Sequence, residues 1–232
     1  MKRKKIKKIK ILFFVFKKML VYSMEQLIRD FPDYNPHQHR QSIPDWFKGN
    51  IFTLTENWFP VIPLDKTKPI TYFEIGAHCG ANVISIMNTY ASHPDSKIYC
   101  CDPWIDYKEY SEYHTVQATN YGLFLDNISK LDLVNKNKLY IYREFSEKVL
   151  PSFQDEMFDI IYIDGNHDEK YVLQDATLAF PKLKKGGWLI FDNFSWDGVK
   201  SGFGLFLMTY HSKFGNPRRQ PGIQVFIQKT EL

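Results

Sequence analysis

The stretch ITYFEIGAHCG, residues 70–80, joins an apolar run typical of a strand to a turn that contains Gly76 and Gly80. Glycine allows a sharp turn and a close ligand approach at Gly76, and it lets the next helix pack against the strand at Gly80. The spacing differs from the G-x-G-x-x-G of dinucleotide sites, and the acidic side chain of Glu74 would repel a pyrophosphate. The stretch therefore predicts a strand, a turn and a helix that cradle a nucleoside carrying positive charge.

The chain that follows this stretch alternates between strand-like and helix-like segments, which indicates a parallel sheet covered on both faces. The expected strands are 70–75, 97–102, 139–143, 158–164, 188–192 and 223–228. The expected helices are 81–90, 113–131, 169–183 and 199–210, with a turn at Gly186 and Gly187. Residues 211–222 leave a further strand short or missing. We therefore predict an α/β fold with a Rossmann-like, doubly wound, mostly parallel sheet of about seven strands, a last antiparallel strand and helices on both faces.

The chain of 232 residues divides into three predicted segments. Residues 1–20 form a basic extension, residues 21–66 an N-terminal helical cap or substrate-side segment, and residues 67–232 the main domain. In the extension, apolar residues at three- and four-residue spacing allow a basic amphipathic helix that lies on an anionic membrane. A disordered, solvated extension explains the same residues equally well. Its longest apolar run, 11–16, is too short to span a bilayer.

Charge and cysteine content limit the partners and the compartment. The net charge is +4, but nine of the 30 Lys and Arg residues lie in the first twenty positions, where no acid occurs. The rest of the chain carries 21 basic and 26 acidic residues, which argues against a nucleic-acid substrate and for a small molecule. Three cysteines, two of them adjacent, give no disulfide framework, and the N-terminus has no signal-peptide cleavage site. We expect a cytoplasmic protein, with peripheral membrane contact through residues 1–20 as the alternative.

A second acidic residue, Asp102, ends the second expected strand, where a carboxylate can accept both hydroxyl hydrogens of a ribose. With Glu74, Gly76 and Gly80 in an E-x-G-x-x-x-G turn, the chain resembles a class I S-adenosylmethionine-dependent methyltransferase over residues 70–232. The resemblance implies that the turn, including Ala77, holds the methionine part and adenosine of S-adenosylmethionine, and that Asp102 holds the ribose. It makes residues 67–232 a methyltransferase domain.

Two further residues near this motif have alternative roles. Trp104 either stacks on the adenine or packs in the interior, and Ser146 either hydrogen-bonds near the adenine or belongs to a turn.

Polar side chains also end two later strands. Asp164 follows the run FDIIYI, while Asp192 and Asn193 follow WLIF. Because the carboxyl ends of neighbouring parallel strands meet at one edge of a sheet, these oxygens can reach one cation, and two carboxylates with an amide suit Mg²⁺ or Mn²⁺. Capping of the following turns is the alternative. His167, three residues after Asp164, is then available as a base.

The second half of the chain resembles the metal-dependent O-methyltransferases of catechols and phenylpropanoids, which hold their ion on residues matching Asp164, Asp192 and Asn193. The catechol enzymes carry lysine where His167 stands, whereas the D-x-x-H form is similar to the sugar O-methyltransferases of macrolide pathways, which use this histidine as base. The resemblance therefore implies an O-methyltransferase acting on a small-molecule hydroxyl, with a sugar or polyol favoured over a catechol.

Two other functions are compatible with the same residues. A metal-independent small-molecule methyltransferase would use Asp164 and His167 as a simple acid and base pair. A non-catalytic cofactor-binding protein would be tethered by its basic tail.

Overall fold

The structure is a computed structural model that describes residues 55, 58–106, 116–129, 131, 133–219 and 224–230. The predicted basic extension and most of the predicted cap lie outside the described residues, so both remain predictions.

Seven strands form a single sheet in the order β3-β2-β1-β4-β5-β7-β6. The strands β1 to β5 are parallel, and β7 runs antiparallel to both β5 and β6. This confirms the predicted Rossmann-like, mostly parallel sheet. The strand bounds are Thr71–Ile75 (β1), Lys97–Cys101 (β2), Leu139–Tyr142 (β3), Phe158–Ile163 (β4), Leu183–Phe191 (β5), Arg218–Arg219 (β6) and Val225–Gln228 (β7).

The fifth strand differs from the prediction, because β5 begins at Leu183 and runs through both glycines that were expected to form a turn. The N–H of Gly186 donates to the carbonyl of Lys229 at 2.7 Å, and the N–H of Lys229 donates to the carbonyl of Gly187 at 3.0 Å. The register against β4 also shifts in this stretch. The glycines therefore form an irregularity within a paired strand, in which Gly186 takes a positive φ of 81°.

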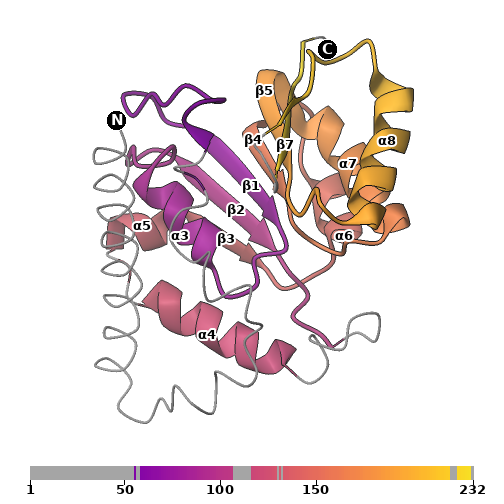
Figure 1. Ribbon diagram of the computed structural model, residues 1–232. Helices are drawn as coiled ribbons and strands as arrows, with labels where there is room; N and C mark the ends of the chain where they lie inside the picture. Colours follow the sequence, from indigo (N-terminus) through magenta and orange to yellow (C-terminus); the bar gives the residue numbers. More distant parts are fainter. Residues whose placement is uncertain are drawn as a thin grey trace, which may run out of the picture.

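Helices cover both faces of the sheet (Figure 1). On one face lie α3 and α4, and on the other lie α6, α7 and α8, while α5 precedes β3. The bounds are Ala81–Asn88 (α3), Gln117–Ser129 (α4), Leu133–Asn137 (α5), Ser146–Val149 (α6), Glu169–Lys182 (α7) and Asp197–Tyr210 (α8), with a 3-10 turn at Leu150–Ser152. The four helices expected from the sequence are present with shorter or shifted ends.

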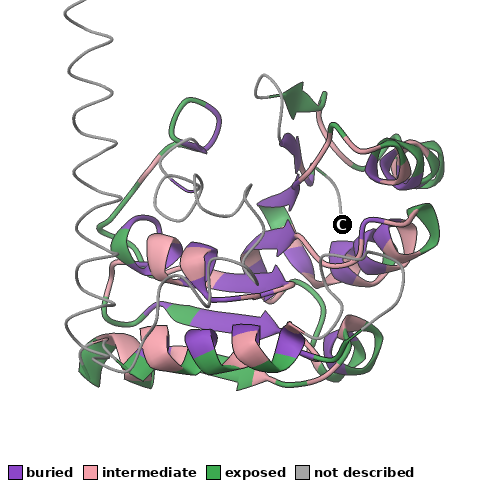
Figure 2. Ribbon diagram, turned by 60° about the horizontal axis from the view of Figure 1, so that its bottom comes forward, coloured by how far each residue is buried: buried purple, intermediate pink, exposed green. Residues whose placement is uncertain are grey.

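Two apolar clusters, one on each face of the sheet, form the core. Successive residues of β1 point to opposite faces, so that Phe73 and Ile75 pack with α7 and α8, while Tyr72 packs with α3 and α4. Trp58 joins the second cluster and is fully buried, with its ring centroid 5.4 Å from that of Tyr162. Residues before β1 therefore contribute to the core. In Figure 2 the strands are largely buried and the helices expose their outer sides.

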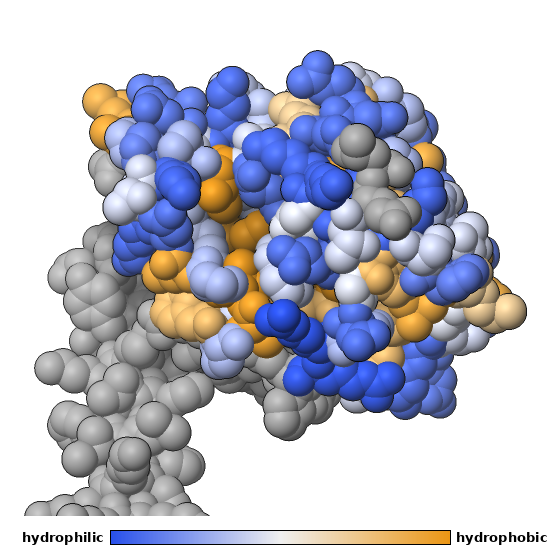
Figure 3. Space-filling model, turned by 90° about the horizontal axis from the view of Figure 1, so that it is seen from above, coloured by the Kyte–Doolittle hydropathy of each residue, from blue (hydrophilic) through white to orange (hydrophobic). Residues whose placement is uncertain are grey.

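The surface is more polar than this core. The face shown in Figure 3 is mostly hydrophilic, and its hydrophobic side chains gather in a few patches. No helix within the described residues combines the length and the apolar character that a membrane crossing requires.

Candidate active site

A cavity of about 420 Å³ lies where the parallel strands end. The strands β1, β2 and β4 are neighbours in register, so the residues that follow them meet at one edge of the sheet. Five residues predicted from the sequence line this cavity together: Gly76, Asp102, Ser146, Asp164 and His167. The cofactor motif and the candidate base thus share one pocket, although more than 60 residues separate them in the chain.

The turn after β1 presses directly against the end of β4. Gly76 has a φ of 87°, and a Cβ atom there would lie 2.0 Å from the carbonyl oxygen of Asp164. The N–H of Asp164 in turn donates to the carbonyl of Ile75 at 2.9 Å. Only glycine fits this close approach, which is the physical reason for its place in the motif.

Gly80 has a comparable role one turn later. Its φ is 82°, and a Cβ atom there would meet the ring of Phe124 in α4 at 2.9 Å. The missing side chain lets α3 begin close to α4.

Asp102 lies at the rim of the cavity with both carboxylate oxygens held by backbone donors. Oδ2 accepts the N–H of His78 at 2.9 Å, and Oδ1 accepts the N–H of Trp104 at 2.8 Å. Burial raises the pKa of Asp102 to about 6, against the effect of these two hydrogen bonds. Each oxygen keeps a further lone pair for a donor such as a ribose hydroxyl.

Glu74 lies beneath the turn, and it is not among the described residues that line the cavity. Its Oε2 accepts the hydroxyl of Tyr72 at 2.8 Å and the amide of Asn82 at 3.1 Å. Burial raises the pKa of Glu74 to about 8. The carboxyl group therefore ties β1 to α3 in the structure, and a direct contact with the cofactor stays a prediction.

Trp104 is packed in the interior, which is one of its two predicted roles. Its indole N–H donates to the carbonyl of His78 at 2.7 Å, and its ring centroid lies 4.8 Å from those of Tyr121 and Phe124. Neither Trp104 nor Ala77 and Gly80 is among the described residues that line the cavity. A cofactor contact by these three residues remains a prediction.

His167 and Asp164 face each other at the end of β4. Nε2 of His167 lies 3.5 Å from Oδ1 of Asp164, at the outer limit of a hydrogen bond. The histidine is only 8% exposed, and its ring packs 4.7 Å from that of Trp196. Burial raises the pKa of Asp164, and His167 opposes this rise.

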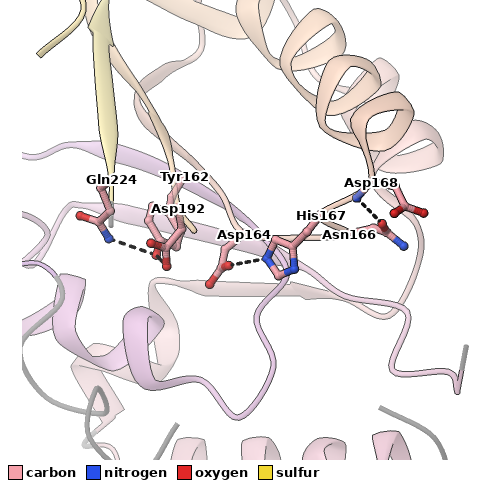
Figure 4. Close-up of polar contacts among 7 residues, drawn as sticks. All are labelled: Tyr162, Asp164, Asn166, His167, Asp168, Asp192 and Gln224. Carbon is pink, nitrogen blue, oxygen red and sulfur yellow. Dashed lines mark hydrogen bonds and ion pairs between the residues drawn. The ribbon is translucent and has the colours of Figure 1, made fainter. Parts of the chain in front are cut away.

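A chain of buried hydrogen bonds ends on Asp192. The indole N–H of Trp58 donates to Oε1 of Gln224 at 2.8 Å, and Nε2 of Gln224 donates to the hydroxyl of Tyr162 at 3.3 Å. That hydroxyl donates to Oδ2 of Asp192 at 2.5 Å. In Figure 4 Asp192, Asp164 and His167 follow one another along the strand ends. The chain fixes the hydroxyl of Tyr162 as a donor, so that Asp192 Oδ2 is an acceptor.

The predicted metal set has one feature that fits a cation. Oδ1 of Asp192 is buried and has no hydrogen-bond partner within the described residues. Burial, and then the negative charge of Asp164, raise the pKa of Asp192 to about 7. Two buried carboxylates that repel each other are stabilised by a cation or by a shared proton.

Other features do not identify a metal. In the part of the chain that the structure describes, no group of three or more His, Cys, Asp and Glu side chains could hold an ion. The predicted set has two carboxylates and the amide of Asn193, a residue with a φ of 52° directly after Asp192. Asp192 and Asn193 are not among the described residues that line the cavity. The metal therefore stays a prediction.

Three lining residues were not predicted from the sequence: Ile105, Phe145 and Asp175. Ile105 and Phe145 are partly exposed apolar side chains in loops, where no pattern distinguishes them. Asp175 had a signal, because it lies in α7 on the apolar stripe with Val172 and Ala176, where a carboxyl group is unusual. Burial raises the pKa of Asp175 to about 7.

Comparisons with known proteins agree with this geometry. A family model described as a methyltransferase domain matches residues 73–194, more than half of the chain. No curated protein sequence matches. Among solved structures, the O-methyltransferase NovP is 16% identical with a TM-score of 0.54, over 78% of each chain. A putative rRNA methylase from Clostridium thermocellum is 12% identical with a TM-score of 0.58, over 78% of this chain and 97% of that one.

A third structure, an S-adenosylmethionine-dependent O-methyltransferase from Thermotoga maritima, is 14% identical with a TM-score of 0.52, over 76% of this chain and 65% of that one. At such identities these structures establish the fold, while the family match covers the turn after β1, Asp102 and the ends of β4 and β5. The chain therefore belongs to the methyltransferase-domain family and is a class I S-adenosylmethionine-dependent methyltransferase.

Proposed function

We propose that this enzyme is an O-methyltransferase that methylates a hydroxyl of a small molecule, with a sugar or polyol favoured over a catechol, assisted by Mg²⁺ or Mn²⁺. One observation carries the proposal: His167 and Asp164 line the same cavity as Gly76 and Asp102. A buried imidazole beside a carboxylate is suited to remove a proton from an alcohol, which needs activation before it can act as a nucleophile. The histidine in the D-x-x-H pattern supports a sugar or polyol over a catechol.

S-adenosylmethionine, when bound, supplies an electrophilic methyl group on a sulfonium ion. The chain would orient it through three groups that line the cavity. The bare backbone of Gly76 leaves room beside β4, the carboxylate of Asp102 accepts the ribose hydroxyls, and Ser146 lies beyond Asp102 toward the base. Holding donor and acceptor in contact would supply a large part of the rate acceleration.

Four other residues predicted to bind the cofactor act, in this proposal, chiefly by shaping the turn. Glu74 is bonded to Tyr72 and Asn82, and Trp104 is bonded to the carbonyl of His78. Ala77 and Gly80 lie in the turn between them, and the N–H of Gly80 donates to the carbonyl of Ala77 at 2.7 Å.

His167 would act as the general base. A hydroxyl placed beside its Nε2 would transfer its proton to that atom, and the nearby carboxylate of Asp164 would stabilise the imidazolium that results. The low exposure of the ring, 8%, keeps competing water away from the proton transfer.

Asp164, Asp192 and Asn193 would hold the divalent ion, which lowers the pKa of a hydroxyl bound to it. The buried Oδ1 of Asp192, with no hydrogen-bond partner within the described residues, supports this assignment. A metal-independent enzyme is the second candidate, favoured by the pKa of about 7 for Asp192, since a proton could then take the place of the cation.

The test is methyl transfer from S-adenosylmethionine to a panel of sugars, polyols and catechols, after chelation and after return of Mg²⁺ or Mn²⁺. His167→Ala should lower turnover by roughly 10²–10⁴-fold while S-adenosylhomocysteine still binds. The matched control is His93→Ala, since His93 pairs with Asp95 outside the cavity. Full turnover in His167→Ala would remove the base from the proposal.

Metal dependence is tested separately. Asp192→Ala should abolish the response to added Mg²⁺ or Mn²⁺. Activity that survives chelation unchanged in the wild type would favour the metal-independent candidate.

A further inference from the structure

Asp175 is a buried carboxyl group on the cavity wall that the proposed chemistry does not use. It lies in α7, is 5% exposed, and lines the cavity together with Ser146 of α6. The hydroxyl of Ser146 donates to Oδ1 of Asp175 at 2.5 Å. Gly165 leaves room for the second oxygen, since a Cβ atom there would lie 3.2 Å from Oδ2.

This hydrogen bond decides what Ser146 offers to a ligand. A serine hydroxyl has one hydrogen to donate and two lone pairs that accept. Because an ionised carboxylate only accepts, it takes the hydrogen of Ser146, and the serine oxygen then presents lone pairs alone. The wall formed by Ser146 and Asp175 therefore accepts hydrogen bonds and donates none.

The position of this wall identifies the part of the ligand that meets it. In the sheet, β2 lies between β3 and β1, and β4 lies on the other side of β1. Asp102 follows β2, Ser146 comes after β3, and Asp164 follows β4. A nucleoside with its ribose on Asp102 and its reactive end at Asp164 therefore extends its base toward Ser146.

We propose that Ser146 and Asp175 recognise the exocyclic amine of the cofactor's adenine, with Asp175 as a positioning residue that holds the serine hydroxyl as an acceptor. The inference rests on the use of S-adenosylmethionine and is independent of the methyl acceptor. An amine donates to these lone pairs, whereas a base with a carbonyl at the same place meets them with lone pairs of its own. The site thus selects adenine over hypoxanthine.

The test compares two ligands on the full-length protein by calorimetric titration: S-adenosyl-L-homocysteine, and S-inosyl-L-homocysteine, in which a carbonyl replaces the amine. Titration at pH 8 keeps Asp175 ionised, because burial raises its pKa to about 7. The wild type should bind the adenosyl ligand at least ~10-fold more tightly, as expected for one hydrogen bond with a charged partner network.

Asp175→Asn should reduce this ratio at least ~5-fold, because an amide can donate to Ser146 and turn the serine hydrogen toward the cavity. Asp95→Asn is the matched control, an exposed carboxyl group outside the cavity, and should leave the ratio unchanged. Ser146→Ala tests the same contact without altering a buried charge and should also lower the ratio. Thermal melting checks that each variant is folded.

Each outcome bears on the inference. A lowered ratio in a folded Asp175→Asn or Ser146→Ala variant supports it. Equal affinity of the wild type for the two ligands, or an unchanged ratio in Ser146→Ala, would overturn it and leave the proposed O-methyl transfer intact. Failure of the wild type to bind S-adenosylhomocysteine would instead overturn the cofactor assignment, and the inference with it.

Discussion

Gly76→Ala probes the contact that brings the cofactor turn against the end of β4. The substitution has two costs. The residue has a φ of 87°, and an L-residue in the left-handed region costs roughly 1–2 kcal/mol. Its Cβ would also lie 2.0 Å from the carbonyl oxygen of Asp164, a backbone atom that no rotamer change can move aside. Overpacking of this kind costs about 1–3 kcal/mol more.

Gly186→Ala separates the two costs. Gly186 has a similar φ of 81°, but no atom lies within 4 Å of a Cβ placed there. The control should therefore lose only roughly 1–2 kcal/mol of unfolding free energy, from the backbone conformation. Gly76→Ala should exceed this loss by about 1–3 kcal/mol.

The assay is urea denaturation of both variants, combined with titration of S-adenosylhomocysteine. Because the new methyl group displaces the backbone of Asp164, Gly76→Ala should also weaken binding, whereas Gly186→Ala should bind as the wild type does. Equal stability losses in the two variants, with equal ligand affinity, would refute the close approach between the turn and β4.

Three further predictions concern buried polar groups. Burial raises the pKa of Glu74 from 4.5 to about 8, so the folded protein keeps a proton that the unfolded chain loses in this range. Stability should therefore fall as pH rises from about 5 to 8, and Glu74→Gln should reduce that fall by an amount on the order of 3 kcal/mol in urea denaturation at both pH values; parallel falls would contradict this. Tyr162→Phe removes the donor to Asp192 and should cost about 1–3 kcal/mol of unfolding free energy. Unchanged stability in that variant would show that the hydrogen bond contributes nothing. Asp102→Ala should raise the dissociation constant of S-adenosylhomocysteine roughly 10–100-fold in calorimetry, and wild-type affinity would disprove its ribose contact.

The sequence was sufficient to predict most of the fold because its strands are short apolar runs bounded by clear turn residues. The first turn is the best example. Gly76 and Gly80 were expected to allow a sharp turn and close packing, and both adopt positive φ against neighbouring groups. In contrast, Gly186 and Gly187 were expected to end a segment, yet pairing with Lys229 keeps them in β5. Such long-range pairing leaves no local pattern.

The site could be predicted where side chains follow strands directly, since topology alone then brings them together. Asp102, Asp164 and His167 are of this kind, and all three line the cavity. Asp175 belongs to a helix and reaches the cavity only because α7 packs beside α6, which no spacing in the sequence reveals. Trp104 shows the reverse case, because a neighbouring helix takes up its ring.

The most direct test of the whole account is a crystal structure of the protein with S-adenosylhomocysteine. The ligand should lie in the cavity with its ribose hydroxyls on the carboxylate of Asp102 and its sulfur beside Asp164 and His167. A ligand bound with its sulfur turned away from His167, or bound outside this cavity, would contradict the account.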